Sequence, residues 1–429
     1  MTDLLSIGSS ALLAYRSALA TTGNNVANAQ TGGYVRRRAD IHELPYVSGS
    51  TVGGIVRSWD AVTVDRSRAA AGSLAQAGTG STWLGRIEAT LGSGAGSVGP
   101  ALSSFFAAAT RLAGDPGSAT LRASFIDGLG HVAATFNRTA SELTALDTAI
   151  AEESSAALVA INDRLDQLAR INESLRTADA GSEACATRED ERDRLIDDLA
   201  GKIAVNCKYG ADGTVRLSTP DSSDIPLLDR DGAGHLSIIE GTLYLSHPDG
   251  TQPISASGGT LAGLDQARAA LGRRVADFDA LARDVVAAMN DWSAGGTTAS
   301  GTPGTDILAG NSAATLGVTL QDPSAIATAA GGRANGNLLA LETVRNSGRF
   351  EQRWDAIVST NAAMLARLQS DTEAASALHD QAQAAREAVS AVDLDAEAAD
   401  LVAMQQAYGA AARIIQTARE AFDAFLSRV

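Results

Sequence analysis

The 429-residue chain is poor in cysteine and in aromatic residues, and both shortages limit the kinds of fold and site that it can form. Its two cysteines, Cys185 and Cys207, allow at most one disulfide, and their spacing matches no metal or redox motif. We therefore expect both to be small core residues. Aromatic residues make up 4% of the chain although 45% is apolar, so the apolar part is mainly alanine, leucine, isoleucine and valine, a mixture that favours helices.

The chain also has few basic residues, and it lacks long apolar runs and a conventional signal peptide. The chain has 50 acidic and 34 basic residues, which gives a net charge of −16. Because such a chain repels phosphate backbones, we do not expect it to bind nucleic acid. No run of about 18 apolar residues occurs, so we expect no membrane insertion. Asp3 and several serines interrupt the N-terminal leucines. A cleavable signal is therefore not expected, and the protein either stays in the cytoplasm or leaves by a route that needs none.

The apolar pattern predicts a mainly α fold, in a chain long enough for about three folding units. Two stretches depart from it. Residues 34–64 are rich in β-branched residues between glycines and predict short strands, and residues 202–259 alternate apolar with polar residues between Asp-Gly turns, which predicts a small inserted β-rich module. Outside the two ends of the chain, the helical pattern covers residues 68–91, 100–112, 188–199, 261–292 and 338–383, and residues 118–175, which it predicts to form one or two long helices.

The two ends of the chain carry heptad-like stripes, and each stripe predicts an amphipathic helix that seeks a partner helix. The two helices are expected to pair with each other or with copies in other subunits. A polar cluster, residues 23–33, should end the first helix in an ordered turn. The stripes consist of Leu5, Gly8, Leu12, Tyr15, Leu19, Thr22 and Val26 at one end, and of Leu394, Ala398, Leu401, Gln405, Tyr408, Ala412, Ile415, Arg419, Phe422 and Leu426 at the other.

Nothing in the sequence predicts a catalytic residue, a metal site or a cofactor. His42-Glu43 begins like a zinc-protease motif, but Tyr46 stands where the second histidine is needed, and the other histidines are scattered. The glycine-rich residues 91–97 lack the lysine and hydroxyl of a phosphate loop. Asp393 and Asp395 could be imagined as paired carboxylates, but their place at a helix start favours capping. We expect the protein not to be an enzyme.

One dense basic run, Arg36-Arg37-Arg38, stands out in the acidic chain. It could provide charge complementarity between subunits, or it could be a solvated turn. The sequence leaves both interpretations open.

Both ends of the chain match the signature of a known family. Residues 21–34 read TTGNNVANAQTGGY and closely resemble the "NNLANxxTPGY" motif of the bacterial flagellar axial proteins of rod, hook and hook junction. This chain has Gly32-Gly33-Tyr34 where the family usually has proline before glycine and tyrosine. Residues 392–397 (VDLDAE) and 405–418 (QQAYGAAARIIQTA) resemble the family's ending "VNLDEE…QQAYxAxARVIQTA".

The long helical middle resembles the members that join hook to filament rather than the hook protein, whose body is mostly β. The resemblance weakens in the inserted module. It rests on Phe105-Phe106, Asp115-Pro116, Arg122, Phe136, the periodic helix to Leu175 and residues 338–361.

The resemblance implies a structural protein of three layers. Residues 1–45 with 393–429 would pair as a coiled coil in an inner tube, residues 46–201 with 260–392 would form a helical-bundle middle domain, and residues 202–259 would be the β-rich module. It also implies a location in the extracellular flagellum, reached without a cleaved signal peptide. The implied partners are copies of the chain, the flagellar hook protein, hook-associated protein 3 on the filament side, the type III export apparatus and a cognate export chaperone.

The expected assembly interface follows from the two stripes and the polar turn. Its residues are Leu5, Leu12, Tyr15, Leu19, Asn24, Asn25, Asn28, Gly32, Tyr34, Leu394, Leu401, Gln405, Gln406, Tyr408, Ile415, Phe422 and Leu426. Three alternatives remain: another flagellar axial protein such as hook or distal rod, a secreted enzyme whose active domain is the β-rich module, and a cytoplasmic coiled-coil scaffold.

Overall fold

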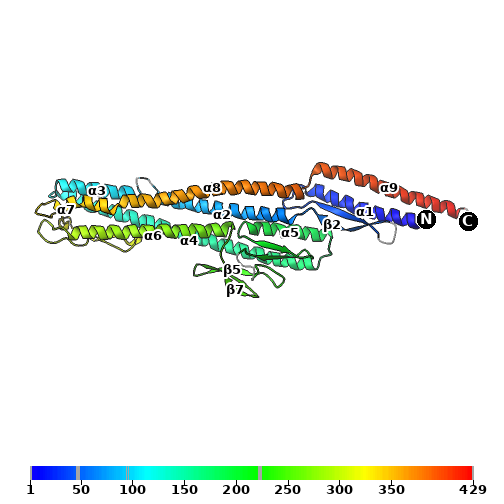
Figure 1. The fold of residues 1–429 in the computed structure, drawn as a ribbon, viewed down its shortest axis with the longest axis horizontal. Coiled ribbons are helices and arrows are strands. Elements are labelled where there is room, and N and C mark those ends of the chain that lie inside the picture. The colour runs from blue at the N-terminus through cyan, green and yellow to red at the C-terminus, as the bar shows by residue number, and fades with distance from the viewer. Residues whose placement is uncertain (1, 45–48, 93, 95, 221–224, 428–429) are drawn as a thin grey trace. The chain divides into compact units, whose positions relative to one another are not determined.

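The computed structural model describes residues 2–44, 49–92, 94, 96–220 and 225–427, and these residues are mainly helical (Figure 1). The helices are α1 (Thr2–Asn28), α2 (Ala61–Leu91), α3 (Val98–Gly114), α4 (Ala119–Arg176), α5 (Glu183–Ala200), α6 (Gly259–Ala294), α7 (Gly336–Gly348), α8 (Phe350–Ser390) and α9 (Leu394–Leu426). The strands are β1 (Arg37–Glu43), β2 (Ser50–Arg57), β3 (Asn206–Tyr209), β4 (Val215–Ser218), β5 (His235–Ile239), β6 (Thr242–His247), β7 (Gly250–Pro253), β8 (Leu308–Ala309) and β9 (Gly317–Val318). The prediction of a mainly α fold with a β-rich insert is confirmed.

Local sequence explains where several helices begin and end. The predicted helix 188–199 starts earlier, as α5, because the Ser182 side chain caps it by accepting a hydrogen bond from the Cys185 main-chain nitrogen at 3.0 Å. Residues 118–175, predicted to form one or two long helices, form the single helix α4. The predicted helical stretch 338–383 forms two helices, because Arg349 adopts a left-handed conformation (φ 48°) between α7 and α8.

The chain forms two compact units, each built from segments that are distant in sequence. The first contains Met1–Gln76, Ala156–Ala262 and Ala374–Val429, and the second contains Ala77–Ser155 and Gly263–Glu373. This division places the terminal helices and the β-rich insert in one unit. It therefore differs from the three predicted domains, whose boundaries stay a prediction; the predicted boundary at residue 46 lies outside the described residues.

The scarce aromatic residues are concentrated in the core of the second unit. Six of the eight phenylalanines are buried there, and Phe136 stacks on Phe278 with ring centroids 4.9 Å apart. Trp354 packs against Phe278 at 5.3 Å, and Phe350 stacks on Phe106 at 6.4 Å. These rings come from α3, α4, α6 and α8, so this unit is a helical bundle held around an aromatic centre.

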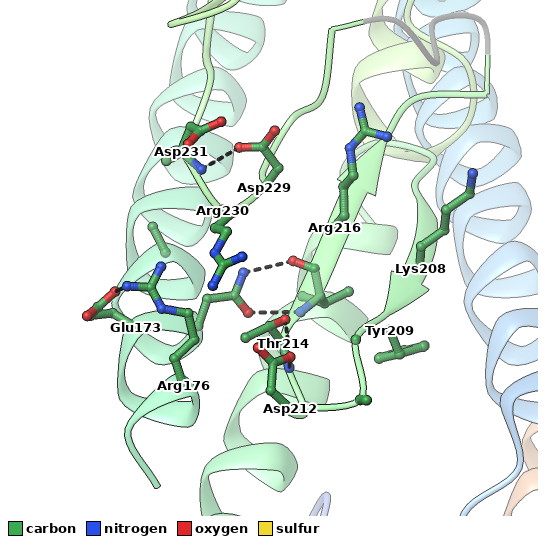
Figure 2. Close-up of a pocket in the computed structure, with 16 residues that line it drawn as sticks. Glu173, Arg176, Lys208, Tyr209, Asp212, Thr214, Arg216, Asp229, Arg230 and Asp231 are labelled. Atoms are coloured by element: carbon green, nitrogen blue, oxygen red, sulfur yellow. Dashed lines mark hydrogen bonds and ion pairs between the residues drawn. The ribbon is translucent and has the colours of Figure 1, made fainter.

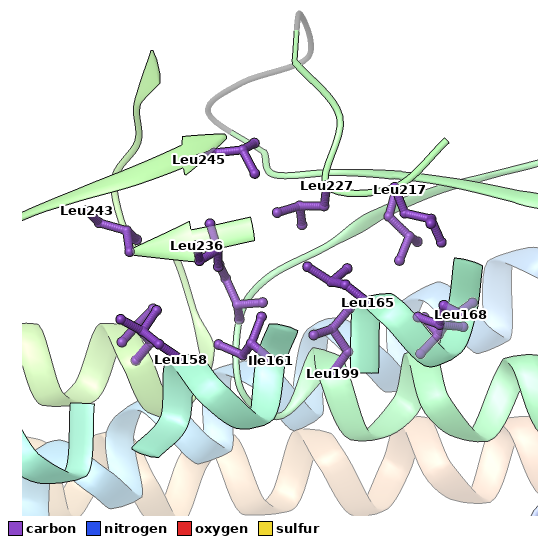
Figure 3. Packing of buried hydrophobic residues seen from close by; sticks show 14 of the residues in the cluster. Leu158, Ile161, Leu165, Leu168, Leu199, Leu217, Leu227, Leu236, Leu243 and Leu245 are labelled. Carbon is purple, nitrogen blue, oxygen red and sulfur yellow. The ribbon is translucent and has the colours of Figure 1, made fainter. Parts of the chain in front are cut away.

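The inserted β-rich module packs onto helices of the first unit (Figure 3). Strands β3 and β4 form one antiparallel pair, and β5, β6 and β7 form a three-stranded antiparallel sheet. The predicted Asp-Gly turns lie between β3 and β4, between β4 and β5, and between β6 and β7. Leu217, Leu236 and Leu245 point from the strands towards Leu165 on α4 and Leu199 on α5. Cys207 packs against the same cluster and Cys185 is buried elsewhere, both as free thiols.

The terminal helices α1 and α9 lie side by side and run in opposite directions (Figure 1). Their approach is close, because a Cβ placed on Gly8 would lie 2.7 Å from Ile415 Cγ1. The antiparallel β1–β2 hairpin follows α1 and also packs on it. Among the described residues, none of the helices combines enough length with enough apolarity to cross a lipid bilayer.

Candidate assembly interface

Helix α1 buries small residues where α9 and the hairpin cover it. The buried positions include Gly8, Ala14, Ala18 and the polar pair Thr21-Thr22, followed by Asn25. The larger residues of the expected interface lie at the edge of this face: Leu12, Tyr15 and Leu19 are half-buried, and Leu5 is 44% exposed. Small residues thus make the helix contact, and larger apolar groups flank it.

The face of helix α9 that is covered in the fold agrees only in part with the predicted apolar stripe. Its buried or half-buried residues are Glu397, Leu401, Met404, Ala407, Tyr408, Gly409, Ala411, Ala412, Ile415 and Ala418, so Ala412 of the predicted stripe is also partly covered. Leu401, Tyr408 and Ile415 are shared with the expected interface. Met404 and Ala418 take the places where the predicted stripe contained Gln405 and Arg419, so its polar interruptions disappear.

The other expected interface residues of α9 face outward. Leu394 and Phe422 are 50% and 52% exposed, and Gln405 and Gln406 are also exposed. The side chain of Leu426 lies outside the described part of the structure.

Asn25 is the centre of a buried hydrogen-bond network at the end of α1, which we call the Asn25 network. The side chain is 1% exposed. Its Nδ2 donates to the main-chain oxygen of Arg37 (2.8 Å) and to Glu397 Oε2 (2.9 Å). Its Oδ1 accepts from the Tyr34 hydroxyl (2.8 Å) and from the Arg37 main-chain nitrogen (3.0 Å). Asn25 therefore uses both donors and both acceptor sites, which joins α1 to β1 and α9.

Glu397 is the acidic partner of this network, and sequence reasoning did not place it in the interface. It is 1% exposed in the first turn of α9. Arg36 Nε donates to Glu397 Oε1 at 2.6 Å, and the same guanidinium contacts Asp400 at 3.2 Å. Burial raises the pKa of Tyr34 to about 12, although nearby Arg37 lowers it, so its hydroxyl stays protonated as a donor.

The remaining turn residues of the expected interface make local contacts. Asn24 is exposed and reaches Glu183 Oε1 at 3.4 Å, and Asn28 donates to the Asn24 main-chain oxygen at 2.9 Å. The chain then reverses, because the Tyr34 main-chain nitrogen donates to the Thr31 oxygen at 3.1 Å. Gly33, with φ 77°, is the third residue of this turn and Gly32 the second. This is the geometry of a type II turn, which favours proline second and glycine third.

Substitutions at the two glycines should have opposite effects. Gly32→Pro restores the residue that the family usually has, and a Cβ there meets no atom within 4 Å, so we expect the free energy of unfolding to rise by about 0.4–1 kcal/mol. Gly33→Ala should lower it by about 1–2 kcal/mol, because φ is positive and the added Cβ would clash with the Arg194 side chain. Urea unfolding of both variants measures the difference, and equal effects would contradict the type II assignment.

A buried arginine–aspartate cluster holds α5 against the hairpin and α2. Arg57 bridges Asp190 and Asp193, both at 2.7 Å, and Arg37 also pairs with Asp190. Arg192 contacts Asp193 at 2.8 Å. Arg68 on α2 and Arg386 on α8 both pair with Asp197, at 2.6 and 2.8 Å.

This cluster and the Asn25 network contain two of the three residues of the basic run Arg36-Arg37-Arg38. Arg36 and Arg37 form ion pairs within the chain, so the interpretation of a solvated turn is wrong for these two residues, whereas Arg38 is exposed. Charge complementarity between subunits stays a prediction. The charged groups of both clusters are paired with one another and hold α2, α5, α8, α9 and the hairpin together.

Sequence comparisons identify the family. A sequence model described as the flagellar hook-associated protein FlgK helical domain matches residues 84–308, just over half of the chain. The chain belongs to the FlgK family. This is a structural family of the flagellum and not an enzyme family, and the resemblance predicted from the two terminal signatures is confirmed.

Individual FlgK relatives are distant in sequence. Flagellar hook-associated protein 1 of Bacillus subtilis is 24% identical over 96% of this chain and 95% of its own length. The protein of the same name from Salmonella typhimurium is 24% identical over 51% of this chain and 41% of its own length. The solved flagellar hook junction protein FlgK from Burkholderia pseudomallei has a similar fold, with a TM-score of 0.52 and 20% identity, over 57% of this chain and 46% of that chain.

Two further models match the ends of this FlgK family member. The flagella basal body rod protein model covers residues 5–34, and the C-terminal model of basal body rod FlgEFG proteins covers residues 386–428. Asn25 and Tyr34 lie in the first match, and Glu397 lies in the second. The Asn25 network therefore joins the two terminal segments of this chain that match the rod-protein models.

Proposed function

We propose that this chain is a subunit of the junction that joins the flagellar hook to the filament, and that it assembles with copies of itself through α1 and α9. The observation that carries the proposal is the apolar surface that this helix pair leaves uncovered. Half of the exposed large apolar side chains among the described residues lie on these two helices: Leu4, Leu5, Leu13, Val26, Leu394, Val402, Ile414 and Phe422.

An exposed apolar surface of this kind favours burial against another protein. Helix α1 contacts its partner mainly through small residues and α9 through Leu401, Tyr408 and Ile415, and the pair leaves other large apolar residues exposed to neighbours. Leu13 is 64% exposed and Phe422 is 52% exposed. Of the expected interface, Leu5, Leu394 and Phe422 would contact neighbouring subunits directly, whereas Asn25 and Tyr34 would set the position of α9 against α1.

The finer parts of the proposal concern partners and export. The subunits would contact the hook protein on one side and hook-associated protein 3 on the other, with the paired helices forming a coiled coil in the inner layer. Export would use the type III apparatus and a cognate chaperone, delivering an unfolded chain to the extracellular flagellum. An isolated helix with partly covered apolar residues such as Leu12 and Leu19 is marginal in water, which fits folding that completes on assembly.

The test is complementation of a flagellated strain that lacks the gene. Such a strain should make hooks and shed filaments into the medium, and the wild-type gene should restore attachment. The double variant Leu13→Gln/Phe422→Gln should remain folded and be exported but should fail to restore attachment, because it makes the outward apolar surface of the helix pair polar. Electron microscopy of cells and medium gives the readout.

A matched control separates this surface from general loss of apolar groups. Val159→Gln/Leu378→Gln changes two side chains that are 59% and 61% exposed but lie on α4 and α8. This control should restore attachment as the wild type does. Attached filaments in cells carrying the Leu13/Phe422 variant would refute assembly through the terminal pair.

A further inference from the structure

The turns of the β-rich module bring one histidine and two aspartates together. Asp229 lies in the loop between β4 and β5, His247 ends β6, and Asp249 lies in the turn before β7. The His247 side chain is 0% exposed, and the Asp229 and Asp249 side chains are 14% and 52% exposed. One ligand atom of each residue lies within 4.8 Å of the others. This group could not be predicted from the sequence, because the three residues do not follow a regular metal-ligand spacing.

The Nε2 atom of His247 is the unusual atom of this group. It is buried and makes no hydrogen bond within the described residues, although Asp229 Oδ1 is 3.4 Å away. A buried polar atom without a partner is costly. Two ligands bound to a tetrahedral metal ion at 2.0–2.1 Å are separated by about 3.3 Å, close to the observed spacing of these two atoms.

The other face of the imidazole is held by Asp249. Nδ1 accepts a hydrogen bond from the Asp249 main-chain nitrogen at 3.3 Å, and Asp249 Oδ2 also lies 3.3 Å from Nδ1. When the ring proton is on Nδ1 instead, the Asp249 main-chain nitrogen can no longer donate to Nδ1, but the Asp249 carboxylate can accept the Nδ1 proton, and the lone pair of Nε2 becomes free. A carboxylate that holds the outer nitrogen in this way is a regular feature of histidine ligands to metals.

Asp229 also opens this group to solvent, because it lines a pocket of about 860 Å³ (Figure 2). Its Oδ1 accepts from the Asp231 main-chain nitrogen at 2.8 Å, which fixes the carboxylate at one end of the pocket. Lys208, Arg216 and Arg230 line the same pocket. Arg176 also lines it, and these four basic residues balance the acidic Glu173, Asp212, Asp229 and Asp231. The pocket therefore has no excess of negative charge that would favour a cation held by electrostatics alone, such as Mg²⁺, whereas an imidazole bond favours a transition metal.

We propose that Asp229 Oδ1 and His247 Nε2 bind a divalent transition-metal ion of the Zn²⁺ type, with water from the pocket completing its coordination and Asp249 holding the imidazole from outside. The ion would tie the loop before β5 to the end of β6. Its role is structural, because it joins two turns of the module that pack through Leu236 and Leu245 onto the helices.

Titration of the full-length, chelator-treated protein with Zn²⁺, followed by calorimetry, tests the proposal. The wild type should bind one equivalent and gain a few degrees in Tm, and Co²⁺ should give the intense d–d absorption of a four-coordinate site. Asp229→Asn and His247→Gln should abolish that absorption. Asp249→Asn should keep it with an affinity lower by about 10–100-fold, the usual effect of losing an outer-shell carboxylate.

His235→Gln is the matched control. His235 also faces an aspartate, Asp166 at 3.7 Å, but its side chain is 58% exposed. This variant should bind Zn²⁺ as the wild type does. Because His247 is buried, its variant could fail to fold; Asp229→Asn decides the matter when circular dichroism shows an intact fold. Unchanged Zn²⁺ affinity in a folded Asp229→Asn protein, or no binding by the wild type, would overturn the proposal.

Discussion

Replacing Asn25 by alanine should lower the free energy of unfolding of the terminal helix pair by about 3–5 kcal/mol. The substitution removes four hydrogen bonds at once. It leaves the buried carboxylate of Glu397 with fewer partners, and it leaves the main-chain nitrogen and oxygen of Arg37 without the bonds that Asn25 supplies. Faster hydrogen exchange of the main-chain amides in α1 and α9, together with urea unfolding, measures the loss.

Two further variants show whether the amide itself is required. Asn24→Ala changes an exposed neighbour and should cost less than about 0.5 kcal/mol. Asn25→Asp keeps the shape but places a second carboxylate 2.9 Å from Glu397, so it should be as damaging as alanine at neutral pH. If the main-chain amides of α9 exchange hydrogen at the same rate in the Asn25→Ala and Asn24→Ala proteins, the Asn25 network does not hold the helix pair together.

Much of the fold could be predicted from the sequence, because apolar spacing reports secondary structure directly. The helix signals at both ends, the Asp-Gly turns of the insert and the strands after Tyr34 were all visible. Boundaries were less visible where one capping residue decides them, as Ser182 does at the start of α5. The break at Arg349 was missed because helix ends of this left-handed kind are usually marked by glycine or asparagine, and here an arginine adopts the conformation.

The site was predictable where family signatures mark it and not where charges pair over long separations. Asn25 and Tyr34 were expected in the interface through their motif. Glu397 was not, because an acidic residue in the first turn of a helix is also explained by the helix dipole. The stripe of α9 was partly displaced because alanine carries a weak periodic signal, so Ala411 and Ala418 could be identified as the covered positions only in the folded chain.

Asp193→Asn is the second change with a large expected effect, about 3–5 kcal/mol, because it removes the negative partner of buried guanidinium groups. Its side chain is 3% exposed and contacts Arg57 at 2.7 Å and Arg192 at 2.8 Å. Asp198→Asn is the matched control: Asp198 pairs with Arg164 at 2.6 Å, but its side chain is 41% exposed, so the loss should stay within about 1 kcal/mol. Equal losses in urea unfolding at neutral pH would contradict a special role for the buried cluster.

The same residue gives a pH dependence of known sign. Burial raises the pKa of Asp193, but Arg192, Arg57 and Arg68 outweigh burial and hold the pKa below its ordinary value. The unfolded state therefore binds more protons, and the stability from this carboxylate is present above its unfolded pKa of about 3.9 and is lost as pH falls through the lower folded pKa. Wild type should lose more stability than Asp193→Asn between pH 5 and pH 2. Because Asp193 faces several guanidinium groups at once, its protonation would loosen α5 from β2 and α2 together.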